Sequence, residues 1–224
     1  PLTVDENDLI TNGGQSNALL VEGQFTTTQG SDGVVQYQLE TGSDPLNGLT
    51  SNGQVITLAE VSNADGSFTY TATANGNPVF TLQVNSDGSY SFELQGAVDH
   101  APNSDTLTLD FSIIATDFDG DVSNTLTLPI TVVDDVPTID GLAQGSEQTV
   151  DEDDLPLGTD RTQDTIIGGT FDVTEGADQV TSIQLSDLTT SVSTLMSGGE
   201  AITLVLTSST GGVNVYQGIT VNSQ

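Results

Sequence analysis

Apolar and polar residues alternate along much of this chain of 224 residues. In the segment 106–116 every second side chain is apolar, at Leu107, Leu109, Phe111, Ile113 and Ala115. A period of two places successive side chains on opposite faces of an extended strand, so this segment is predicted to be a strand with one buried face. Shorter stretches with the same alternation are 35–39, 68–72, 80–84, 90–94, 126–132 and 202–206.

Turn signals separate these predicted strands. The clearest are Asp65-Gly66, Asn75-Gly76, Asp87-Gly88 and Gly211-Gly212. The segment 80–94 is therefore predicted to be a hairpin closed at 86–89. No segment has the spacing of an amphipathic helix, and the acidic segment 150–155 forms one helical turn at most. Many short strands without intervening helices predict an all-β fold, an antiparallel β-sandwich of the immunoglobulin-like or cadherin-like type.

The first residues of the chain recur later in the sequence. Val4-Asp5-Glu6-Asn7-Asp8-Leu9 returns as Val150-Asp151-Glu152-Asp153-Asp154-Leu155, at an offset of 146 positions. The same offset relates 23–25 to 169–171, 38–39 to 184–185 and 56–58 to 202–204. A constant offset predicts tandem repeats, with 1–137 as the first complete repeat and 138–224 as the first half of the second. The stretch 134–137 ends in Pro137, which restricts the chain to an extended path and indicates a linker between repeats.

The charge balance excludes whole classes of function. The chain has 32 Asp and Glu residues against one Lys or Arg, which is Arg161, and its formal net charge is -31. A nucleic-acid binder needs clustered Lys and Arg, and docking on anionic membranes needs the same, so neither partner is expected. No run of apolar residues is long enough to insert into a membrane or to act as a signal peptide. The absence of Cys excludes disulfides, thiol catalysis and Cys-ligated zinc.

One acidic loop follows the strand predicted at 106–116. Asp117, Asp119 and Asp121 surround Gly120, and three carboxylates this close repel one another unless a cation lies among them. A hard cation with flexible geometry, such as Ca²⁺, suits that set. The loop is not an EF-hand, because it lacks Gly at the sixth position and Glu at the twelfth. The alternative is a solvated acidic turn, and Phe118 is expected to turn back towards the core.

A second acidic group lies where one predicted repeat joins the next. Its members are Asp134, Asp135, Asp5, Glu6, Asp8, Asp151, Glu152, Asp153 and Asp154. Calcium ions that bridge two domains would remove the freedom of the linker, so a calcium joint is predicted here. The alternatives are an acidic helix N-terminus and a plain solvated linker.

The sequence gives little support to catalysis. His100 is the only His, and a single His near Asp99 is more often structural than part of a catalytic triad. A pair of carboxylates for glycoside hydrolysis carries no information in a chain this acidic. The phosphate-binding loop, the zinc protease motif and the nucleophile elbow do not occur, so we predict that the chain is not an enzyme.

Several stretches together resemble a known family. The matching residues are Asp99-His100, the segment 105–111, the segment 115–121 and the segment 130–137. They are similar to the tandem extender repeats of giant bacterial adhesins exported by type I secretion, called RTX adhesins or biofilm-associated proteins. The resemblance implies calcium ligands at Asp117, Asp119 and Asp121, and also at Asp99, Asp134 and Asp135.

The same resemblance implies a place and a role. The chain would be a β-sandwich spacer on the outside of a Gram-negative cell, stiffened by extracellular calcium and packed against neighbouring repeats of the same chain. It would project a terminal region that binds a host or surface ligand for attachment or biofilm formation. The alternative is a calcium-dependent module that itself binds a glycan or a protein. The absence of Trp, together with Tyr residues on core-facing positions, favours the spacer.

Overall fold

A computed structural model of the chain describes residues 2–11, 19–28, 30–142, 150–159, 167–177, 180–186 and 194–220. The chain forms two compact units, Pro1–Asp178 and Gln179–Gln224. Arg161 lies outside the described residues. Among the described residues, no helix has the length and apolar character needed to cross a membrane.

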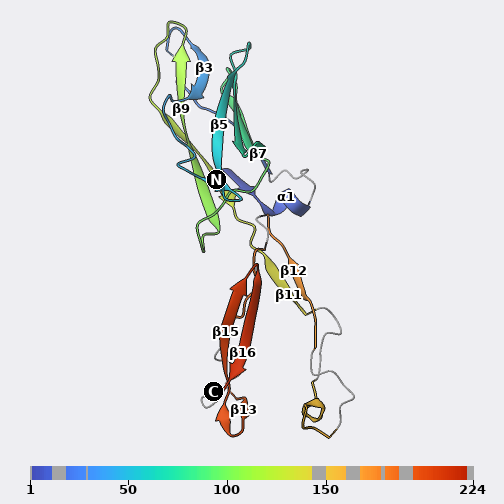
Figure 1. Cartoon of the computed structure of the whole chain (residues 1–224). Coiled ribbons are helices and arrows are strands. Elements are labelled where there is room, and N and C mark those ends of the chain that lie inside the picture. Colours follow the sequence, from blue (N-terminus) through green and yellow to red (C-terminus); the bar gives the residue numbers. More distant parts are fainter. Residues whose placement is uncertain are drawn as a thin grey trace. The chain divides into compact units, whose positions relative to one another are not determined.

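Two sheets form a sandwich in the first unit (Figure 1). The first has the order β1-β10-β9-β3, with β1 at Leu2–Asp5, β10 at Leu126–Val133, β9 at Thr106–Asp117 and β3 at Val34–Leu39. The second has the order β2-β8-β7-β6-β5-β4, with β2 at Leu20–Gln24, β8 at Ser89–Leu94, β7 at Asn77–Val84, β6 at Phe68–Ala74, β5 at Gln54–Ser62 and β4 at Thr50–Ser51. Neighbouring strands are antiparallel except β1, which runs parallel to β10. The predicted all-β sandwich is confirmed, and so is the hairpin of β7 and β8.

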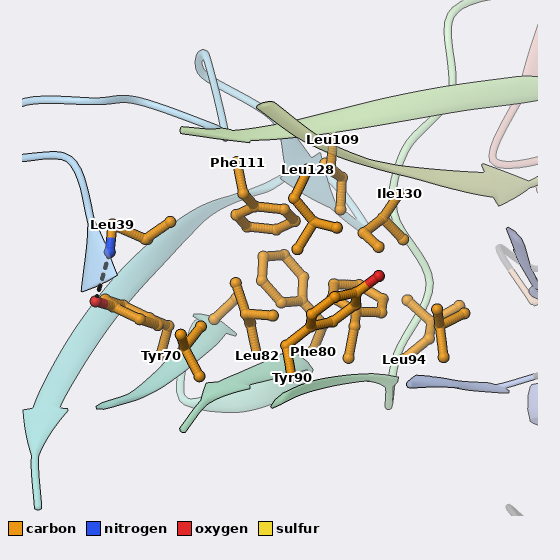
Figure 2. Packing of buried hydrophobic residues seen from close by; sticks show 14 of the residues in the cluster. Leu39, Tyr70, Phe80, Leu82, Tyr90, Leu94, Leu109, Phe111, Leu128 and Ile130 are labelled. Atoms are coloured by element: carbon orange, nitrogen blue, oxygen red, sulfur yellow. Dashed lines mark hydrogen bonds between the residues drawn. The ribbon is translucent and has the colours of Figure 1, made fainter. Parts of the chain in front are cut away.

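The apolar faces of the two sheets meet in one core. Figure 2 shows buried side chains of β9 and β10 facing those of β6, β7 and β8. The ring centroids of Phe80 and Phe92 lie 5.0 Å apart, and that of Phe111 lies 5.8 Å from Phe80 and 6.0 Å from Phe92. All three rings are fully buried. The period of two therefore predicted the inward face of these strands correctly.

Tyr70 ties one sheet to the other. Its ring lies in the core, and its hydroxyl accepts a hydrogen bond of 2.9 Å from the backbone N–H of Leu39 (Figure 2). Tyr70 belongs to β6 and Leu39 to β3, so the bond crosses the sandwich. Desolvation raises the pKa of Tyr70 to about 12, and the nearby Glu60 adds to the rise although the Leu39 hydrogen bond opposes it.

Two helical turns begin at the recurring acidic motif. The Asp5 carboxylate accepts the N–H of Asn7 at 3.0 Å, and α1 (Asn7–Thr11) follows. The Asp151 carboxylate accepts the N–H of Asp153 at 3.0 Å, at η2 (Glu152–Asp154), in the segment where one helical turn was predicted. The sequence showed no helical spacing at α1, because a helix of five residues is too short to show it, but an acidic helix N-terminus was one of the alternatives for this stretch.

The second unit repeats local structure of the first. Its strands are β13 (Met196–Ser197), β14 (Glu200–Ala201), β15 (Thr203–Thr210) and β16 (Val213–Ile219). The Leu185 N–H donates to the Tyr216 hydroxyl at 3.1 Å, which is the Leu39–Tyr70 bond shifted by 146 positions. The ladder of β15 with β16 pairs Thr203 with Ile219, 146 positions after the pair Thr57–Thr73. The sequence repeat therefore corresponds to repeated hydrogen bonding.

The remaining ladder of the first unit comes after the predicted linker. Strands β11 (Thr138–Leu142) and β12 (Phe171–Thr174) pair in antiparallel fashion with a bulge. The division of the chain into repeats at 137 and 138 stays a prediction.

Candidate metal sites

The acidic loop after β9 is a turn capped by its own first carboxylate. Asp117 Oδ1 accepts the N–H groups of Gly120 at 3.1 Å and of Asp121 at 2.8 Å. The backbone N–H of Asp117 in turn donates to the carbonyl of Asp121 at 3.1 Å. Gly120 has a φ of 96°, a conformation that an L side chain rarely adopts. The sequence Asp117 to Asp121 thus folds into a tight reversal that holds its carboxylates at the end of the four-stranded sheet.

The segment before β3 brings another carboxylate, Asp32, to this loop. Ligand oxygens of Asp32, Asp117 and Asp119 all lie within 4.8 Å of one another. Asp32 precedes β3, and β3 pairs with β9 so that Val34 faces Asp117. Sequence reasoning missed Asp32, because the antiparallel pairing of two strands far apart in the chain places it there. Asp121, which was predicted as a ligand, is not a member of this group.

The carboxylates of Asp117 and Asp119 influence each other. Hydrogen bonding with Asp117 and the charge of Asp117 raise the pKa of Asp119. Desolvation acts to raise the pKa of Asp117, but hydrogen bonds from Asp119 and from the N–H groups of Asp121 and Gly120 hold it below its ordinary value. The carboxylate oxygens of Asp32, Asp117 and Asp119 are ligands that suit a hard cation, and the cation can complete its coordination shell with water on the side open to solvent. The residues present therefore fit Ca²⁺.

Phe118 does not turn back to the core as expected. Its side chain is 81 % exposed. The residue lies at the tip of the reversal, beyond the last pair of β3 with β9, where neither sheet offers an apolar surface to cover it. The exposed ring of Phe118 therefore stands between two candidate ligands, Asp117 and Asp119.

The structure brings part of the predicted joint together. Desolvation raises the pKa of Asp135, and the charges of Asp5 and Asp134 raise it further, against a hydrogen bond of 3.1 Å from the Ala177 N–H. Asp5, Asp134 and Asp135 thus lie within electrostatic reach of one another. They meet because β1 pairs in parallel with β10, which places the ends of both strands side by side.

The other predicted ligands have local roles. Asp99 Oδ2 accepts the Thr50 hydroxyl and, at 2.9 Å, the N–H of Gly53, so it fixes the loop before β9 to the turn between β4 and β5. Asp151 caps η2, which also contains Glu152 and Asp153. Among the described residues, none of these four belongs to a group of converging ligands. Their role in calcium binding stays a prediction.

Residues 1–129 match a family described as a domain of unknown function, DUF5801. The chain belongs to the DUF5801 family. No curated protein and no solved structure matches the chain.

The DUF5801 match covers most of the sandwich. It includes the loop residues Asp117, Asp119 and Asp121 and ends before Asp134 and Asp135. The acidic turn is therefore part of the DUF5801 domain, whereas the two carboxylates that follow β10 lie beyond the matched residues.

Proposed function

We propose that this DUF5801 chain is a non-catalytic, calcium-stiffened extender repeat of a bacterial cell-surface adhesin. In this role it lies outside a Gram-negative cell, packs against neighbouring repeats of the same chain and projects a ligand-binding region carried by other domains. The proposal is supported by the sandwich fold, by the recurrence of its hydrogen bonds at an offset of 146 positions and by the excess of 32 acids over one basic residue. It also rests on the resemblance to RTX adhesin repeats.

The group of Asp32, Asp117 and Asp119 is the observation that carries the proposal. A Ca²⁺ ion held there would join the loop before β3 to the turn after β9 and would remove the repulsion among the three carboxylates. Both segments lie at one end of the four-stranded sheet. Calcium would therefore order this end of the sandwich and oppose its fraying.

The test is calcium binding by a matched pair of variants. Asp119→Asn removes a candidate ligand, whereas Asp110→Asn removes the same charge from an exposed position in β9 outside the group. Calorimetric titration with Ca²⁺ should show affinity lowered at least tenfold in Asp119→Asn and nearly unchanged in Asp110→Asn. The rise in melting temperature on adding Ca²⁺ should shrink in the same order.

Small-angle scattering then tests stiffness. The unsubstituted chain should give a longer and narrower particle with Ca²⁺ than with chelator, and Asp119→Asn should lose part of that response. The calcium mechanism is wrong if the unsubstituted chain shows neither binding nor a change in melting temperature. Equal losses in both variants would mean general charge screening instead of a site.

The exposed ring of Phe118 supports a second candidate function. An aromatic side chain beside a calcium site is a surface on which a sugar or peptide can stack, so the loop would then be a calcium-dependent binding module. A glycan array probed in Ca²⁺ should give a signal that Phe118→Ala abolishes, while Phe118→Ala leaves the calcium affinity unchanged. An array without signal favours the spacer.

A further inference from the structure

A histidine and two carboxylates converge from three separate parts of the first unit. Glu6 follows β1, His100 lies between β8 and β9, and Asp134 follows β10. His100 Nδ1 lies 4.0 Å from Oε2 of Glu6 and 3.7 Å from Oδ1 of Asp134. Ligand atoms of all three residues lie within 4.8 Å of one another. The parallel pairing of β1 with β10 brings the two carboxylates together, and the loop before β9 supplies the imidazole.

This cluster is buried, unlike the acidic loop. Glu6 has no exposed surface, and the side chains of His100 and Asp134 are 3 % and 19 % exposed. Burying two ionisable acids and an imidazole in an otherwise apolar sandwich costs free energy unless hydrogen bonds or a bound ion replace the lost water. The chain also has only one Lys or Arg against 32 acids, so a bound cation is a natural counter-charge for such a cluster.

Hydrogen bonds hold the Glu6 carboxylate and the backbone of Glu6 and Asp134 in place. The Val98 N–H donates to Glu6 Oε1 at 2.8 Å, and Oε2 of Glu6 lies 4.0 Å from Nδ1 of the imidazole. The Glu6 N–H donates to the carbonyl of Val133 at 3.0 Å, and the Asp134 N–H donates to that of Asp105 at 3.1 Å. Ligands fixed by surrounding hydrogen bonds are typical of a preorganised metal site.

We infer that Glu6, His100 and Asp134 bind a divalent transition-metal ion of the Zn²⁺ and Co²⁺ class. Calcium takes oxygen ligands, whereas an imidazole nitrogen with two carboxylate oxygens suits these borderline ions. Ligand atoms around a tetrahedral ion with bonds near 2.1 Å lie about 3.4 Å apart, so separations of 3.7 and 4.0 Å need to close only slightly. The sequence alone had predicted Glu6 and Asp134 as calcium ligands, and the nitrogen donor changes the choice of ion.

The imidazole has a carbonyl oxygen on each side. Nδ1 lies 2.8 Å from the carbonyl oxygen of Val98, and Nε2 lies 3.5 Å from that of Val132. An ion bound at Nδ1 would take the place of the contact with the Val98 carbonyl, and the neutral imidazole would carry its single proton on Nε2, which faces the Val132 carbonyl. A ligating His commonly directs its other N–H at a backbone carbonyl in this way.

The experiment uses Co²⁺ as a probe that reports its own ligands. The full chain, freed of metal with a chelator, should bind one equivalent of Co²⁺ in calorimetry and show visible ligand-field bands of a four- or five-coordinate ion. His100→Gln and Asp134→Asn should each weaken binding at least tenfold. Asp110→Asn, which removes the same charge from an exposed position in β9 outside the cluster, should weaken it less than twofold.

Three results would overturn the inference. They are no binding of Co²⁺ or Zn²⁺ by the unsubstituted chain, unchanged binding in His100→Gln, and equal losses in Asp134→Asn and Asp110→Asn. A loss of folding in His100→Gln is recognised by circular dichroism, and Asp134→Asn then decides the question. The calcium proposal is tested separately, because Asp119→Asn should leave Co²⁺ binding intact.

Discussion

Tyr70 shows how one side chain links the two sheets of the sandwich. Its hydroxyl accepts the buried N–H of Leu39, while Tyr216 makes the corresponding bond to Leu185 in a more exposed setting. A buried donor that loses its acceptor costs about 1–3 kcal/mol, whereas water replaces an acceptor at an exposed donor. Substituting Tyr70 and Tyr216 in turn therefore compares the same hydrogen bond in a buried and in a more exposed setting.

We predict that Tyr70→Phe lowers the free energy of unfolding by about 1–3 kcal/mol, and that Tyr216→Phe lowers it by less than about 1 kcal/mol. Urea denaturation at neutral pH measures both. Equal costs for the two substitutions would show that the Leu39 bond gains nothing from burial.

The same residue predicts a response to alkali. The folded pKa of Tyr70 is raised to about 12 from the ordinary tyrosine value of 10.0, chiefly because burial disfavours the phenolate. Its contribution to stability is fully present below pH 10 and is lost as the pH rises through 12. Urea denaturation across this range should show a fall in stability that is smaller in Tyr70→Phe. An identical fall in both proteins would assign the effect to other groups.

At the scale of the elements, β2 and β8 approach closely at one glycine. A Cβ added at Gly23 would overlap the hydroxyl and Cζ of Tyr90 and lie 2.9 Å from its Cε1. The Tyr90 ring cannot easily move, because it stacks on Phe25 with centroids 4.8 Å apart. Gly23 also belongs to the recurring motif, where its counterpart is Gly169. The Tyr90 ring lies so close to the backbone of β2 that only glycine fits at position 23, in the middle of this strand.

We predict that Gly23→Ala lowers the free energy of unfolding by about 1–3 kcal/mol through overpacking. Gly30→Ala is the control, because nothing lies within 4 Å of the added Cβ. Its effect should be within about 0.5 kcal/mol. Thermal or urea unfolding of both variants provides the comparison, and similar values for the two would contradict the proposed clash.

At the scale of the whole molecule, charge is the dominant feature. A net charge of -31 on 224 residues makes the folded state repel itself. Monovalent salt screens this repulsion, since the Debye length falls from about 30 Å at 0.01 M to about 3 Å at 1 M. Bound calcium would act differently, by neutralising a few carboxylates at fixed positions.

We predict that 1 M NaCl raises the melting temperature by several degrees relative to 0.01 M NaCl. Millimolar Ca²⁺ should raise it further at constant ionic strength, and Mg²⁺ should do so less, because it keeps its water and demands octahedral geometry. Scanning calorimetry in these buffers provides the measurement. Equal effects of the two divalent ions would indicate screening without a calcium site.

The sequence by itself determined strands β3, β6, β7, β8, β9, β10 and β15, the buried faces of β6 to β10, the turns between them and the internal repeat, but it did not predict β1, β2, β4, β5 or β16. The predicted features follow from local rules: a period of two marks a face, Asp-Gly pairs mark reversals, and a constant offset marks a repeat. The acidic turn at Asp117 and Asp119 was predictable for the same reason, because its carboxylates are close in sequence.

Only the tertiary structure decided which distant residues meet. The pairing of β3 with β9 brought Asp32 to the acidic turn, and the pairing of β1 with β10 brought Glu6 to Asp134 and His100. Alternation in one segment does not say which strand pairs with which, because pairing and register depend on the packing of both sheets. Burial also reversed two local expectations: Glu6, a carboxylate in an acidic run, is enclosed, and Phe118, an aromatic ring, is exposed because no core lies beneath the tip of its turn.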